Sequence, residues 1–201
     1  MAANSLVRGV FLLTLSGLFT RLVGAVYRVL LVRALGAEGV GLIQMTFPLF
    51  HLGSTLATAG MPAALAKVYS EKAAQGNWKQ AQRAVFVTWI IVVPLILLST
   101  MILMLAAPWI SRVMLTDTRT YPSLVVMPAA IAVSSISWVL RGYFQGQQNL
   151  APTAYAQMVE QVVRVIAVLT LAVFFLPYGL AYAAAGAMAG LAIGEAGGLL
   201  I

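Results

Sequence analysis

Long apolar runs alternate with short polar connections along the whole chain. One run, residues 84–107, reads AVFVTWIIVVPLILLSTMILMLAA and contains no charged residue. A helix rising about 1.5 Å per residue needs roughly 20 apolar residues to cross the hydrocarbon core of a bilayer. Six segments meet this requirement, at about residues 9–34, 40–66, 84–108, 121–143, 153–176 and 179–201. The pattern therefore predicts an all-α integral membrane protein with six transmembrane helices.

The connections between these segments are short and carry the residues typical of turns. Examples are GAEGVG at residues 36–41 and QGQQNLAP at residues 145–152. Hydrophobic residues make up 62% of the chain and charged residues 8%, and the mean hydropathy is +0.96. This composition excludes an ordinary soluble domain, so we expect residues 1–201 to form a single transmembrane domain. Because the chain has no cysteine, disulfides and thiolate metal sites are also excluded.

The basic residues predict how the chain is oriented in the membrane. Cytoplasmic loops carry an excess of lysine and arginine. With the N-terminus inside, the cytoplasmic side holds six basic residues and the outer side three. The six are Arg8, Lys67, Lys72, Lys79, Arg83 and Arg141, and the three are Arg33, Arg112 and Arg119. We therefore expect a multi-pass protein of the cytoplasmic membrane with a cytoplasmic N-terminus, and the net charge of +7 gives no argument for a nucleic-acid partner.

Three arginines, Arg21, Arg28 and Arg164, fall at membrane depth. A charge at that depth costs at least a few kcal/mol unless it meets water or a counter-charge. Arg21 and Arg28 belong to a stripe of small and polar residues spaced by three and four, which places them on one face of a helix. A second such stripe contains Gln44 and His51. The stripes predict a shared polar interior lined by several helices.

The sequence leaves two interpretations open for several of these residues. Arg28 can line a cavity or extend toward the outer interface, whereas Arg21 lies closer to mid-span, where a cavity role is favoured. Arg164 is a cavity candidate, but it follows Glu160 by one helical turn and can pair with it instead. A lone intramembrane histidine such as His51 can hydrogen-bond a neighbouring helix or relay protons.

The last segment differs in character from the others. It sets glycines four residues apart, which forms a ridge that another helix can approach closely; these are Gly186, Gly190, Gly194 and Gly198. Glu195 lies beside this ridge and is either a coupling site for a cation or proton, or a group that reaches water at the cytoplasmic end. The chain stops inside an apolar run, from which we expect it to be the N-terminal part of a longer protein.

Two stretches carry a resemblance to a known family. TRLVGAVYRVLLVRALGAEGVGLIQMTFPLF and RGYFQGQQNLAPTAYAQMVEQVVRVI resemble the N-terminal part of the stage V sporulation protein B and polysaccharide-export family. That family belongs to the superfamily of multidrug and lipid-oligosaccharide exporters, and the lipid II flippases are more distant members. The resemblance extends over essentially the whole chain. It implies that the chain is one lobe, the N-lobe, of a two-lobed exporter fold.

The resemblance also implies a function. We expect a flippase that moves a lipid-linked oligosaccharide or peptidoglycan precursor by alternating access, with Arg21 and Arg28 holding the anionic headgroup. Gln44, His51 and Arg164 are further cavity candidates, and Glu160 and Glu195 are structural or coupling candidates. A second lobe and membrane lipids are the expected partners.

Two alternatives are a cation-coupled multidrug exporter of the same fold and a non-transporting membrane scaffold. An enzyme is not expected, because the sequence shows no nucleophile with a base, no metal-ligand cluster and no phosphate-binding loop. No cofactor or metal is expected either.

Overall fold

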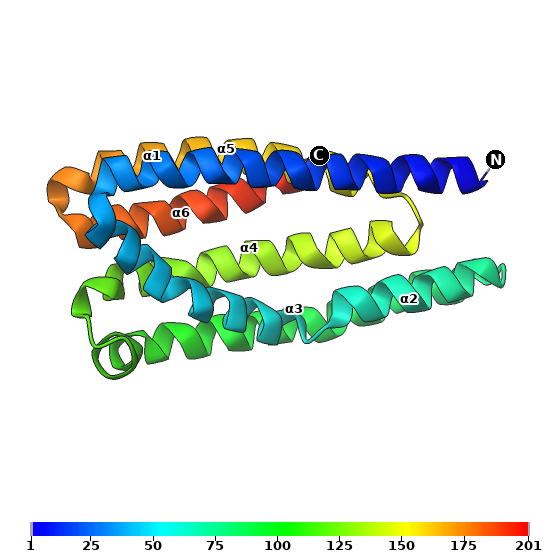
Figure 1. The fold of residues 1–201 in the computed structure, drawn as a ribbon. Coiled ribbons are helices and arrows are strands. Elements are labelled where there is room, and N and C mark those ends of the chain that lie inside the picture. The colour runs from blue at the N-terminus through cyan, green and yellow to red at the C-terminus, as the bar shows by residue number, and fades with distance from the viewer. Residues whose placement is uncertain (1, 201) are drawn as a thin grey trace.

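The chain folds into a bundle of long helices (Figure 1). The computed structural model describes residues 2–200, with side chains from Gly9 onward, so the side chain of Arg8 lies outside the described residues. No strand occurs in residues 2–200. The helices are α1 (Ala2–Thr58), α2 (Met61–Ala74), α3 (Trp78–Trp109), α4 (Tyr121–Gly146), α5 (Ala151–Phe175) and α6 (Leu180–Leu199). Short turns η1 (Ile110–Met114) and η2 (Thr118–Thr120) precede α4, and η3 (Leu176–Tyr178) precedes α6.

Helix α1 consists of two arms that meet at Gly36. The backbone of Gly36 has φ 71° and ψ 176°, a conformation that no helix contains and that only glycine adopts readily. In Figure 1 the first arm, residues 2–35, runs beside α5, and the second arm, residues 37–58, crosses toward α3. We call these the N-terminal arm and the crossing arm.

The number of membrane-spanning helices differs from the sequence prediction. Five helices in residues 9–199 are long and apolar enough to cross a membrane, whereas the sequence predicted six. The difference arises at Gly36, where the two arms are joined by a kink without an intervening loop and form one helical span, whereas the sequence predicted two helices separated by a loop. The prediction of an all-α membrane protein is confirmed.

A second break separates α1 from α2 where the sequence suggested one helix. Ala59 and Gly60 both have positive φ angles, 47° and 71°, so the crossing arm ends at Thr58. Pro62 lies in the first turn of α2. A backbone N–H at this position would have no partner within the helix, so proline loses no hydrogen bond there, and its fixed φ suits the helix. The polar helix α2 then extends toward the α2–α3 turn (Figure 1).

The glycine ridge of α6 packs against α5, and this is the most extensive helix contact in the fold. A Cβ atom added at Gly190 would lie 2.5 Å from the Cα of Val168, and one at Gly194 would lie 2.5 Å from the Cβ of Arg164. Both distances are shorter than any real contact, so only glycine permits this approach. The partner of the ridge is therefore a helix of the same chain.

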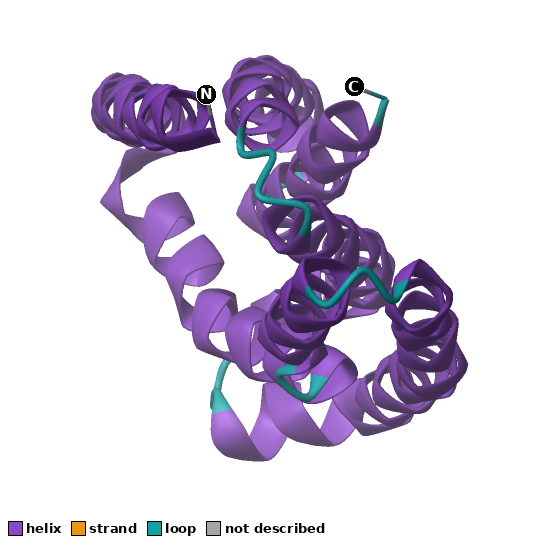
Figure 2. Ribbon diagram, turned by 90° about the vertical axis from the view of Figure 1, so that its right-hand side faces the viewer, coloured by secondary structure: helices purple, strands orange, loops and turns teal. Residues whose placement is uncertain are grey.

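Helix α4 is the centre of the bundle. It packs against α6 on one side and against α2 and α3 on the other. A Cβ added at Gly142 would lie 2.5 Å from the carbonyl oxygen of Pro62, so α2 also approaches through a glycine. Figure 2, which looks along the bundle, shows most helices end-on with short loops between them.

The two ends of the bundle differ in charge. The N-terminus, the α2–α3 turn and the α4–α5 connection lie at one end (Figure 1), which also holds Lys67, Lys72, Lys79 and Arg83. We call it the basic end. At the opposite end Arg119 pairs with both Glu38 and Asp117. Arg141, which we expected at the cytoplasmic surface, is instead half-buried between helices.

Candidate functional site

A cavity of about 770 Å³ lies between the two arms of α1. All its lining residues come from α1, because the break at Gly36 turns one long helix into two walls. The polar and aromatic lining residues are Arg21, Tyr27, Arg28, Gln44, Phe47 and His51. Four of the five cavity candidates from the sequence are among them, and Arg164 is not.

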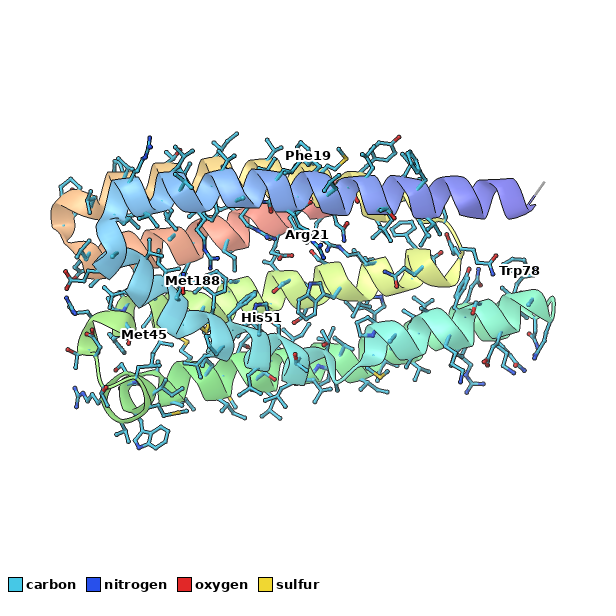
Figure 3. The ribbon with its side chains drawn as sticks, viewed as in Figure 1. Phe19, Arg21, Met45, His51, Trp78 and Met188 are labelled. Carbon is cyan, nitrogen blue, oxygen red and sulfur yellow. The ribbon has the colours of Figure 1, made fainter. Side chains whose placement is uncertain are left out.

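The four candidates form two pairs, and the members of each pair lie equally far from Gly36 along their own arms. Arg28 and Gln44 are each eight residues from Gly36, and Arg21 and His51 are each fifteen residues from it. With a rise of about 1.5 Å per residue, the first pair lies about 12 Å and the second about 22 Å along the helix axes from the break. Figure 3 shows Arg21 below the N-terminal arm and His51 on the crossing arm, on opposite sides of the space between them.

The cavity is electropositive. Two guanidinium groups line it, and none of its lining residues is an aspartate or glutamate. Both arginines are exposed to the cavity or to solvent, so neither is buried as an unpaired charge. An arginine pair without a counter-charge, set between apolar walls, focuses a positive potential that attracts anions.

Regular spacing along each arm explains why these residues share one space. Arg21, Gly24 and Arg28 recur at intervals of three and four, as do Gln44, Pro48 and His51, so each set follows one helix face. A Cβ added at Gly24 would contact the side-chain amide of Gln161 at 3.6 Å. The edge of the first stripe therefore lies against α5, and the rest faces the cavity.

Two aromatic lining residues were missed by the sequence analysis. Tyr27 and Phe47 lie in the cavity wall, and the ring centroid of Phe47 is 6.2 Å from that of His51. The ring centroid of Phe50 is 5.5 Å from that of His51. Tyr27 directly precedes Arg28, and Phe47 lies about one helical turn from both Gln44 and His51. This nearness to predicted polar residues was the signal that could have identified them. His51 thus lies close to two aromatic rings.

The remaining candidates form a separate charge network between α4, α5 and α6. Glu160 on α5 pairs with Arg164 one turn later and with Arg141 on α4. Arg164 also pairs with Glu195 on α6, with 3.0 Å between Nη2 and Oε1. The two carboxylates are buried, and two arginines balance them. We call these four residues the charge network.

The charge network changes the reading of Glu195. The sequence left open whether Glu195 reaches water at the cytoplasmic end, but the residue is 5% exposed. One of its carboxylate oxygens, Oε2, is buried without a hydrogen-bond partner among the described residues. Arg164 forms an ion pair with this carboxylate, so we interpret the network primarily as a connection between helices.

Metal binding has no support in the described part of the chain. In residues 2–200 no three side chains of histidine, aspartate or glutamate come together in a group that could hold a metal ion. The α1 cavity offers guanidinium, amide and aromatic groups.

Comparison with known proteins identifies the family. Residues 6–201 match the family described as "Polysaccharide biosynthesis protein". Stage V sporulation protein B of Bacillus subtilis (strain 168) is 42% identical over 100% of this chain and 39% of its own length. Lipid II flippase MurJ of the same organism is 31% identical over 99% of this chain and 39% of its own length. The uncharacterized membrane protein YabM is 32% identical over 96% of this chain and 35% of its own length.

These matches also show how much of its relatives the chain represents. It spans about two fifths of the length of the curated relatives it matches. No solved structure matches the chain significantly. Together, the family match and the five long apolar helices show that this multi-pass membrane protein belongs to the polysaccharide biosynthesis protein family.

Proposed function

We propose that the chain is one lobe of a flippase that moves a lipid-linked oligosaccharide or peptidoglycan precursor across the cytoplasmic membrane. The observation that carries this proposal is the α1 cavity, in which Arg21 and Arg28 face an interior without acidic lining residues. Guanidinium groups stay charged and bind phosphate oxygens in a bidentate manner. The diphosphate of a lipid-linked precursor fits this chemistry, and a relative named as a lipid II flippase supports it.

The spacing of the two arginines along the N-terminal arm offers the headgroup two successive contacts. Arg21 and Arg28 are seven residues apart, about two helical turns or 10 Å. An anionic headgroup entering between the arms meets one arginine before the other. Gln44 and His51 face them from the crossing arm and supply polar contacts for sugar or phosphate oxygens.

The alternative of a cation-coupled multidrug exporter has weaker support. That function calls for a membrane carboxylate that is free to bind a proton or cation. Glu160 and Glu195 are instead paired with arginines in the charge network, and neither lines the α1 cavity.

Alternating access in such folds is one lobe moving against another, so the partner lobe, whether part of the same polypeptide or a second copy, completes the transport path.

We also propose that the basic end faces the cytoplasm. Lys67, Lys72, Lys79 and Arg83 gather there, whereas Arg119 at the opposite end is neutralised by Glu38 and Asp117. Lysine and arginine accumulate on the cytoplasmic side of membrane proteins. This orientation puts the N-terminus inside the cell.

The experiment that tests the proposed function follows lipid-linked precursor in cells that depend on the full-length protein. Arg21→Ala and Arg28→Ala are compared with Arg112→Ala, which removes an exposed arginine outside the cavity. At matched membrane abundance, we expect precursor to accumulate on the cytoplasmic leaflet in the first two variants only. Normal translocation in both would contradict the proposed site, and a drug-export defect in its place would support the multidrug alternative.

A further inference from the structure

A second concave surface lies between α2 and α3 at the basic end. It has a volume of about 420 Å³, within the range of about 300–1,000 Å³ that ligand pockets occupy. Lys72, Gln80 and Arg83 line the half nearest the α2–α3 turn, and Leu65, Val68 and Val87 line the other half. We call it the α2–α3 groove. It shares no lining residue with the α1 cavity.

The polar half of the α2–α3 groove carries positive charge that is not compensated within the chain. Neither Lys72 nor Arg83 forms an ion pair with any described side chain. The ammonium of Lys72 is 3.5 Å from the amide oxygen of Gln75, a weak contact. Glu71, beside Lys72, is directed to Lys67 on the exposed face. Two cationic side chains that line one groove are therefore available to an anion.

The apolar half of the groove faces the surroundings of the bundle. Val68 is 39% exposed and Val87 is 41% exposed. Val87 belongs to the uncharged run that begins at residue 84, and Arg83 is the charged residue immediately before that run. The groove thus crosses the boundary between the polar interface and the hydrocarbon layer. A water-soluble anion would fill only the charged half.

We propose that the α2–α3 groove binds an anionic phospholipid of the leaflet at the basic end. Lys72 and Arg83 hold the headgroup phosphate, and an acyl chain lies along the exposed Val68 and Val87. Basic pockets between transmembrane helices are known to select anionic lipid headgroups. The groove combines a basic half for the headgroup with an apolar half for an acyl chain. This inference does not depend on what the α1 cavity transports.

Native mass spectrometry of the full-length protein tests this inference. The protein is released from mixed micelles that contain phosphatidylglycerol or phosphatidylcholine, and the retained lipid is counted. Lys72→Gln/Arg83→Gln is compared with Lys67→Gln/Lys79→Gln, which removes the same charge at the same end but outside the groove. We expect the first variant to lose phosphatidylglycerol about tenfold or more, with the control close to wild type.

A steric variant keeps the inference testable if the charge variant does not fold. Ala64 lines the groove and is exposed, so Ala64→Phe fills the groove without changing charge. We expect it also to lower phosphatidylglycerol retention. Equal losses in both charge variants would reduce the effect to general surface charge and overturn the proposed site. Equal retention of phosphatidylcholine, or complete competition by inorganic phosphate, would overturn it as well.

Discussion

Arg164 of α5 and Glu195 of α6 form an ion pair with 3.0 Å between Nη2 and Oε1. The contact depends on the glycine beside Glu195, because a Cβ at Gly194 would lie 2.5 Å from the Cβ of Arg164. Glu160 and Arg141 extend the pair to α4. The charge network and the glycine ridge are therefore two parts of one helix-packing arrangement.

Glu195→Gln should destabilise the folded protein. The change leaves Arg164 with one carboxylate instead of two in a buried site, and breaking a buried pair costs about 3–5 kcal/mol. We expect roughly 3 kcal/mol, at the low end, because Glu160 remains. Thermal unfolding in detergent measures the effect. Glu71→Gln, at an exposed glutamate, is the matched control. An equal shift of the unfolding temperature in both variants would show that the charge network stabilises the fold no more than a surface pair does.

Gly190→Leu should separate α6 from α5. The new side chain would start 2.5 Å from the backbone of Val168, and overpacking of this kind costs about 1–3 kcal/mol or more. The yield of folded protein by size exclusion and the unfolding temperature are the measurements. Gly17→Ala is the control, because no atom lies within 4 Å of a Cβ there. A variant that keeps wild-type stability would mean that the ridge does not need glycine.

Gly36→Ala should destabilise the break between the arms of α1. With φ 71° and ψ 176°, any other residue is strained by about 1–3 kcal/mol. There is open space around a Cβ at this position, so the expected loss comes from backbone conformation alone. Gly41→Ala, also in open space but helical, should be neutral or stabilising. If both variants unfold at the same temperature, the break does not require glycine.

Asp117→Asn should show a pH-dependent effect at the end opposite the basic end. Hydrogen bonds from Arg119 lower the pKa of Asp117 below its usual value of 3.8. A lowered folded-state pKa stabilises the protein at pH values above the unfolded pKa, and this contribution disappears as the pH falls through the folded value. Because the pair is at the surface, we expect less than about 1 kcal/mol. Wild type should exceed the variant in stability at pH 7, and the gap should narrow as the pH falls below 3.8; a constant gap would contradict the ionic cause.

The sequence predicted the parts of this structure that depend on local spacing. Uncharged runs such as residues 84–107 predicted the long helices, and glycines four apart predicted a close helix contact. Positions three and four apart placed Arg21 with Arg28 and Gln44 with His51 on common faces. Each of these features follows from the helical repeat within one segment.

The features that the sequence did not predict depend on contacts between segments. The GAEGVG segment has the composition of a loop, yet all of it except Gly36 is helical, because neighbouring helices support both arms. Spacing shows that Glu160 can meet Arg164, but nothing in a single helix indicates that Arg141 and Glu195 complete the network. In the same way, Tyr27 and Phe47 become cavity residues only when the two arms face each other.

Translocation in proteoliposomes shows whether Arg21 and Arg28 hold an anionic headgroup. The full-length protein and its Arg21→Gln/Arg28→Gln variant are reconstituted at equal density with a fluorescent lipid-linked precursor, and the fraction that becomes accessible on the opposite leaflet is measured over time. We expect the double variant to lose at least about tenfold in rate, since each charged contact is worth about 1.5–3 kcal/mol. A wild-type rate in the double variant would show that the cavity arginines do not bind the transported headgroup.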